Sequence, residues 1–275
     1  MASGDKEHRM LFDLRGRRKN VVKVVYAMLA ALMGISLFVA VGPFNIGELF
    51  NSNSGSVNAA EPYEEQAERI EVKLKKDPQD PELLLALTRA QLNAANAKVN
   101  VEPNGARTYT TEGVQEYQRA GDSWSKYLKS TEEPSPNLAQ LMAPAFITLA
   151  ELARNYDEAQ VNLEASAAAQ EIVTEQRPSL NSYSTLAYYT YFTGDYAAAE
   201  KAEAEAKKLA KSKAEEKAIE TQLKPISKRA REYQNERKQA EKEEAEAAKA
   251  GGEAPSPENL EGSPLEGLGG GGLGG

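Results

Sequence analysis

The chain has 275 residues, a net charge of −8 and no cysteine, which excludes disulfides, thiolate metal sites and cysteine nucleophiles. Its single histidine, His8, lies in the short basic N-terminal segment, so neither a Ser-His-Asp triad nor a histidine metal cluster can form elsewhere. The acidic balance opposes nucleic-acid binding, which needs a basic surface. We therefore predict a protein that is not an enzyme, has no cofactor or metal, and does not bind nucleic acid.

The first structural signal is an uncharged stretch from Val24 to Gly47, apolar as far as Val41. Val21 and Val22 extend it beyond Lys23, whose long side chain can reach the membrane surface. The run is long enough to cross a bilayer of about 30 Å. We predict a transmembrane helix over residues 21–42, with lipid contacts from Val21 to Gly42.

The charges flanking this span predict its orientation. Residues 1–23 carry seven Lys or Arg and three Asp or Glu, a net of +4, so the remainder sums to −12. Because basic flanks stay in the cytoplasm, the N-terminus should be cytoplasmic and the main domain extracytoplasmic, on a bacterial inner (plasma) membrane. The alternative is a cleavable signal peptide with a site at residues 57–59. That site lies about sixteen residues beyond Val41, which favours an uncleaved signal-anchor.

Small residues recur four apart within the predicted span. Ala27 with Ala31, and Ala30 with Gly34, have the spacing that lets two membrane helices approach closely. A homodimer through this face is therefore possible.

The remaining chain divides by composition. Alanine, glutamate, lysine and leucine dominate its middle, and β-branched residues are sparse, which predicts an all-α fold. Proline-containing breaks at residues 77–81, 134–136 and 177–178 separate helical patterns. The predicted segments are a basic head (1–20), the transmembrane helix (21–42), a flexible linker (43–60), a helical repeat domain (61–233), a charged helical extension (234–250) and a disordered Gly/Pro-rich tail (251–275).

The clearest internal unit is Ser179–Lys211, where Leu186-Ala187, Gly194-Asp195-Tyr196, Ala199 and Ala206 recur at set spacings. This pattern resembles the tetratricopeptide repeat (TPR). The resemblance implies two antiparallel helices that meet at a tight turn. Gly194 would take the place of the turn glycine, and Tyr183 that of the large residue of the first helix.

Two further units match less well. The unit Gln140–Pro178 keeps Phe146 and Leu163, but Arg154 replaces the glycine, and the second helix is about two turns too long. The first unit opens at Pro81, and residues 120–128 suit its second helix. Between its helices lies an insertion at residues 96–111, which contains a turn signal at residues 101–105.

Amphipathic stretches flank these units. Residues 61–76 predict a leading cap with Ala67, Ile70 and Leu74 on one side. Residues 218–233 carry an apolar stripe that predicts a closing cap. Within it, Pro225 should kink the helix or begin a new one.

The TPR resemblance implies a concave surface, formed by the first helix of each pair, that binds peptides or partner helices. We expect Tyr188 and Tyr191 to be exposed there, and Arg89 to pair with a peptide carboxylate. The family's groove positions, carried onto this sequence, fall in three groups: Glu82, Leu85, Arg89 and Leu92; Thr148, Glu151 and Leu152; and Asn181, Ser184, Tyr188, Tyr191 and Phe192.

Two functions follow from this organisation. One is a membrane-anchored adaptor or scaffold that binds protein partners, co-chaperone-like in envelope protein secretion or assembly. Its plan is similar to that of ancillary proteins of the bacterial secretion machinery. Import receptors of the mitochondrial outer membrane have the same plan, but their repeat domain faces the cytosol. The alternative is a structural, self-associating membrane spacer without a dedicated peptide ligand.

Overall fold

The computed structural model describes residues 59–101 and 107–249. Within this part no helix combines the length and the apolar character that a membrane span needs. The predicted head, transmembrane helix, nearly all of the linker, and the tail lie outside the described residues, and so do the small-residue pairs of the span. The described chain is mostly helical, which confirms the predicted helical class.

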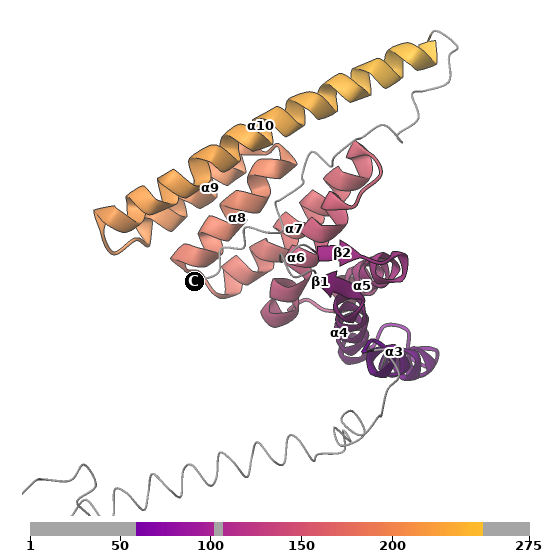
Figure 1. Cartoon of the computed structure of the whole chain (residues 1–275). Helices are drawn as coiled ribbons and strands as arrows, with labels where there is room; N and C mark the ends of the chain where they lie inside the picture. Colours follow the sequence, from indigo (N-terminus) through magenta and orange to yellow (C-terminus); the bar gives the residue numbers. More distant parts are fainter. Residues whose placement is uncertain (1–58, 102–106, 250–275) are drawn as a thin grey trace, which may run out of the picture. The chain divides into compact units, whose positions relative to one another are not determined.

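Eight helices and two short strands make up the described residues (Figure 1). In chain order they are α3 (Glu61–Leu74), α4 (Pro81–Ala97), β1 (Val99–Val101), β2 (Arg107–Tyr109), α5 (Thr111–Ser130), α6 (Pro136–Glu151), α7 (Tyr156–Gln176), α8 (Leu180–Thr193), α9 (Tyr196–Lys208) and α10 (Lys213–Lys249).

Polar side chains set the helix starts. Asp80 Oδ1 accepts hydrogen bonds from the backbone N–H groups of Glu82 and Leu83 at 2.9 and 3.0 Å, and Pro81 follows as the first helical residue. Ser179 and Ser182 form a reciprocal capping box at the start of α8. Such caps satisfy N–H groups that have no partner within the helix, which is why the predicted breaks coincide with helix boundaries.

Consecutive helices pack as three pairs, α4 with α5, α6 with α7, and α8 with α9. One cluster of buried residues joins α4 to α7, with Trp124, Leu138 and Met142 inside it, and a second joins α6 to α10 around Leu163 and Phe192. Helices α6 and α7 contribute to both clusters and so link them. The three predicted helix pairs are confirmed as pairs.

The leading cap is also confirmed. Ala67 and Ile70 of α3 are buried against Leu87 and Ala90 of α4, and Leu74 is half-buried beside them. Burying side chains of this kind is the main force that holds such a helix in place.

The insertion after α4 contains a small antiparallel hairpin that sequence analysis did not anticipate. Val99 pairs with Tyr109, and Val101 pairs with Arg107. Val99 and Tyr109 both pack against the core, and the ring of Tyr109 lies edge-on to Tyr117 at 6.1 Å. These contacts hold the Val99–Tyr109 end of the hairpin against the core, whereas Val101 and Arg107 at its other end are exposed. Local sequence alone would not specify this extended conformation.

Of the two outcomes expected at Pro225, a kink or a new helix, the start of a new helix is wrong. The structure has one helix through this proline. Leu223 and Ala230, on either side of Pro225, are buried against the preceding helices, and this packing holds both halves in register. The residues that fulfil the predicted closing cap are Ile219, Leu223, Ala230 and Tyr233, all buried.

The turn between α8 and α9 ties α10 to the last pair. Gly194 has φ +88°, a left-handed conformation that favours glycine. The buried Gln234 of α10 lies directly over it and donates from Nε2 to the carbonyl oxygen of Phe192 at 2.7 Å and to Gln160 Oε1 at 3.0 Å. A Cβ at position 194 would lie 3.1 Å from Gln234 Cδ.

Replacing this glycine should therefore destabilise the domain. In Gly194→Ala, left-handed strain and the contact with Gln234 should lower the free energy of unfolding by roughly 1–2 kcal/mol. Chemical denaturation followed by circular dichroism measures it. Gln222→Ala, at an exposed residue of α10, is the control and should change the value by less than about 0.5 kcal/mol. Equal effects of the two substitutions would contradict this role of Gly194.

Candidate protein-binding surfaces

One apolar surface that is open to solvent lies on α6. Leu141 is 45% exposed and Leu152, at the end of the helix, is 37% exposed. Pro144 is exposed between them and Thr148 is half-buried. Because these residues follow one another at intervals of three or four, they share one side of the helix. The other side of α6 is buried in the core.

Helix α10 packs against α8, the first helix of the third pair. Burial raises the pKa of the Tyr188 hydroxyl of α8, Tyr189 and Glu151 raise it further, and Arg229 of α10 lowers it. Such electrostatic influence requires that the charges of Glu151 and Arg229 lie near Tyr188. The exposed side of α6 therefore lies near α8, the helix against which α10 packs.

The expected exposure of Tyr191 is wrong. Its side chain is 3% exposed, and its hydroxyl donates to Glu203 of α9 at 2.7 Å. Burial, followed by this hydrogen bond, raises the pKa of Tyr191. Ser184 is also buried, and its Oγ has no hydrogen-bond partner among the described residues. Neither side chain is available to a ligand in this structure.

The remaining predicted residues do not form one continuous surface. Leu92 and Phe192 are buried in the core, which removes them from the groove. Arg89 and Glu82 are exposed on α4, with Leu85 half-buried between them. Asn181 instead lines a hollow of about 620 Å³ between the start of α8 and the start of α10, with Leu209 and Ile219.

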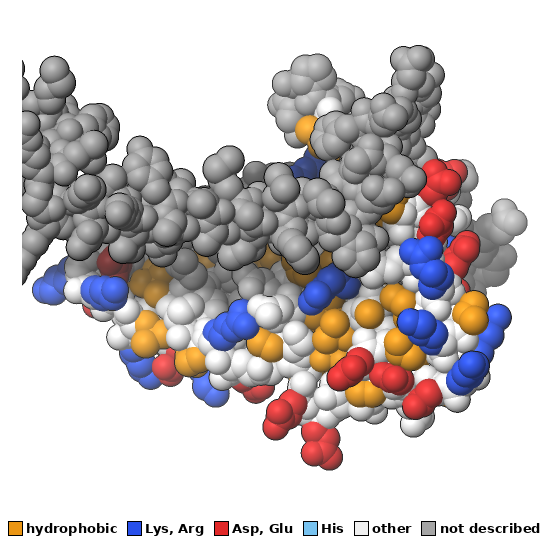
Figure 2. Space-filling view, turned by 90° about the horizontal axis from the view of Figure 1, so that it is seen from below, with side chains coloured by type: hydrophobic (Ala, Val, Ile, Leu, Met, Phe, Trp, Pro, Cys, Tyr) orange, Lys and Arg blue, Asp and Glu red, His pale blue; other side chains and the backbone are white. Residues whose placement is uncertain are grey.

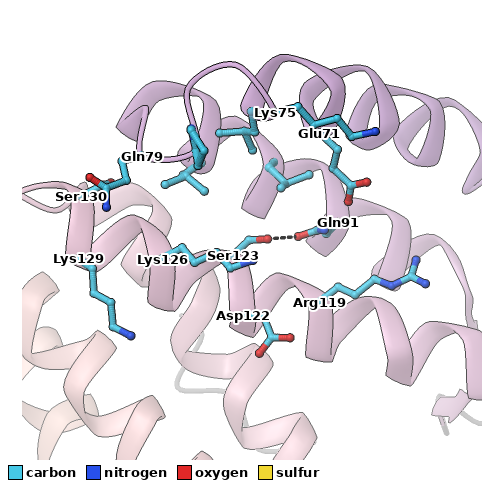
Figure 3. A pocket seen from close by; sticks show the side chains of 14 residues that line it. Glu71, Lys75, Gln79, Gln91, Arg119, Asp122, Ser123, Lys126, Lys129 and Ser130 are labelled. Atoms are coloured by element: carbon cyan, nitrogen blue, oxygen red, sulfur yellow. Dashed lines mark hydrogen bonds between the residues drawn. The ribbon is translucent and has the colours of Figure 1, made fainter.

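Two further clefts lie beside the second helices of the pairs. The first, of about 610 Å³, is bounded by α3, α4 and α5 (Figure 3). Ser123 Oγ donates to Gln91 Oε1 at 2.7 Å across its middle. Glu71 and Arg119 lie toward one end, and Gln79 and Ser130 toward the other.

The second cleft, of about 760 Å³, is bounded by α7, α8 and α9. Its lining is acidic, whereas the lining of the first cleft is basic. Its charged residues are Glu164, Glu171, Glu175, Asp195, Glu205 and Lys201. Several of these carboxylates are already engaged: Asp195 caps α9, Glu205 pairs with Lys208, and Glu164 accepts from Gln160.

Neither cleft was predicted from the sequence, because the groove that the TPR resemblance implies is formed by the first helix of each pair. The spacing of like charges on the second helices could have indicated both clefts. Lys126 and Lys129 are three residues apart on α5, and Glu171 and Glu175 are four residues apart on α7, so each pair shares one side of its helix. Elsewhere the charges are mixed. On the visible part of the face in Figure 2, acidic and basic side chains are interspersed with small apolar areas.

Comparison of the chain with protein-family models, curated proteins and solved structures finds no match.

The buried tyrosines predict how stability changes at high pH. Burial raises the pKa of Tyr189 to about 12, from 10.0. The folded state therefore holds this proton more tightly than the unfolded state. Stability should be unaffected by Tyr189 below pH 10 and should fall between pH 10 and 12. Unfolding free energies measured across this range test the expectation.

The contribution of Tyr189 can be isolated by substitution. Tyr189→Phe should make the loss of stability above pH 10 shallower, since phenylalanine has no proton to lose. Tyr63→Phe, at an exposed residue, is the control. An unchanged pH profile in Tyr189→Phe would show that Tyr189 does not contribute to the loss.

Proposed function

We propose that this protein is a membrane-anchored scaffold, built from TPR-like helix pairs, that binds protein partners outside the cytoplasm. The observation that supports it best is the uncovered side of α6, where Leu141 and Leu152 are exposed. Exposed apolar residues that share one face of a helix are a common feature of protein-binding surfaces.

The partner we propose is a peptide segment or an amphipathic helix. Its apolar side chains would cover Leu141 and Leu152, and a carboxylate would pair with Arg89. Arginine suits this role because its guanidinium offers two parallel hydrogen bonds to one carboxylate. The bound segment would follow α4 and α6, because α10 takes the corresponding position beside α8.

Anchoring is the second part of the proposal. The apolar run over residues 21–42 and the net charge of +4 before it support a single span with the N-terminus in the cytoplasm. The helical domain would then meet proteins of the cell envelope, and a role in their secretion or assembly is consistent with a scaffold held at the inner membrane.

A photo-crosslinking amino acid tests the binding surface. Placed at Leu141 or Leu152 in living cells, it should give discrete adducts with partner proteins. The matched control is Val161, a 65% exposed apolar residue on α7, where adducts should be absent. Leu141→Asp should remove the adducts formed from position 152. Equal adduct patterns from positions 141 and 161 would argue against a dedicated surface on α6.

Protease accessibility tests the topology. If the domain faces outward, protease added to spheroplasts should digest residues 61–233 while an epitope tag at the N-terminus stays protected. A cytoplasmic marker protein should remain intact in the same sample. Digestion of the domain only after lysis would place it in the cytoplasm and refute this part of the proposal.

A further inference from the structure

The cleft between α3, α4 and α5 has an apolar floor and a basic rim. Leu84 and Leu87 of α4 are buried at its base, and the Gln91–Ser123 hydrogen bond satisfies the polar groups there. The cations on its lining are Lys75, Arg119, Lys126 and Lys129, against the two carboxylates of Glu71 and Asp122. Four cations and two carboxylates leave a net charge of +2.

Three of these cations lack an ion-pair partner within the described part of the chain. Among the described residues, no ion pair involves Lys75, Lys126 or Lys129, whereas Arg119 pairs with Glu116 at 2.8 Å. The cleft between α7, α8 and α9 carries five carboxylates and one lysine, so a basic rim is not a general property of the clefts in this domain. An acidic segment with apolar side chains would complement the α3–α4–α5 cleft.

The chain itself contains such a segment. Residues 253–266, outside the described part, read Glu-Ala-Pro-Ser-Pro-Glu-Asn-Leu-Glu-Gly-Ser-Pro-Leu-Glu. They hold four glutamates, and no Lys or Arg follows Lys249. Leu260 directly precedes Glu261, and Leu265 directly precedes Glu266. The segment therefore contains two places where an apolar side chain is next to a negative charge.

The length of chain after α10 is sufficient to reach back to the domain. Gln234 contacts α7 and α8, and the remaining fifteen residues of α10 extend roughly 22 Å beyond it. The sixteen residues from Lys249 to Leu265 can span about 53 Å. In Figure 1 the C-terminal end of α10 lies toward the side of α7 and α5, opposite its start beyond α9.

We propose that the acidic segment 253–266 docks in the α3–α4–α5 cleft of its own chain. One of its leucines covers the floor at Leu84 and Leu87, and its glutamates pair with Lys126 and Lys129. A tethered segment has an effective concentration of about millimolar when its linker can span the distance, which favours the same chain over a second copy. The inference is independent of the function proposed for α6.

Carbodiimide cross-linking of the full-length protein in detergent tests the docking directly, because it joins carboxylates to lysines only when they touch. Mass spectrometry should find Glu258, Glu261 or Glu266 joined to Lys126 or Lys129. Lys217 and Lys224, exposed on α10, are the matched controls and should give no such product. Absent products, or equal yields at the control lysines, would overturn the proposal.

A mixture of isotopically light and heavy protein identifies the source of the segment. Cross-links within one isotope only support docking in the same chain. Mixed-isotope products at the level expected for random pairing would show that the segment comes from a second copy, which would overturn the intramolecular assignment.

A binding measurement gives an independent result. A fluorescent peptide of residues 253–266 should bind a chain that ends at Lys249, and Lys126→Gln/Lys129→Gln should weaken that binding by about threefold to tenfold. Lys217→Gln/Lys224→Gln should leave the affinity unchanged. Because exposed pairs are screened by salt, 1 M salt should also weaken binding. Equal affinities of the two double variants would overturn the proposal.

Discussion

The packing of α10 against the last helix pair is the interaction on which the exposed surfaces of this domain depend. Tyr233 lies between the rings of Tyr156 and Phe192, with centroid distances of 5.7 and 6.5 Å, and Gln234 bonds to Gln160 and to the Phe192 carbonyl. These contacts join three helices distant in sequence. They close the end of the core, and they also decide that the surface beside α8 is occupied while the surface of α6 remains open.

The turn at Gly194 makes this packing possible. A residue with a Cβ would be strained at φ +88° and would press on Gln234. Glycine therefore allows both the left-handed backbone of the turn and the close approach of the Gln234 side chain. Arg231 adds a contact at the same interface, with its guanidinium 4.1 Å from the centre of the Tyr196 ring. The tight turn between α8 and α9 and the position of α10 are therefore linked features.

Much of the helical layout could be predicted from the sequence, because its determinants are local. Asp80 and Ser135 cap helices whose first residue is proline, and Gly194 ends α8. The exposure of Tyr191 could not be predicted in this way. Its position within α8 gives only the angle of its side chain about the helix axis, whereas its burial depends on Glu203 and on α10, which begins more than twenty residues later. The hairpin at Val99–Tyr109 likewise depends on contacts with α5.

The cost of displacing α10 indicates which surface a partner would use. Displacing α10 would expose its own Ile219, Leu223 and Tyr233, and each fully buried side chain of this kind contributes roughly 1.5–3 kcal/mol. A partner competing for α8 would have to replace that burial before it gained any binding energy. A partner on α6 meets no such cost, because Leu141 and Leu152 are already uncovered. If α6 binds a partner as proposed, the helix that stabilises the domain would also restrict that partner to the first two helix pairs, without any change in shape.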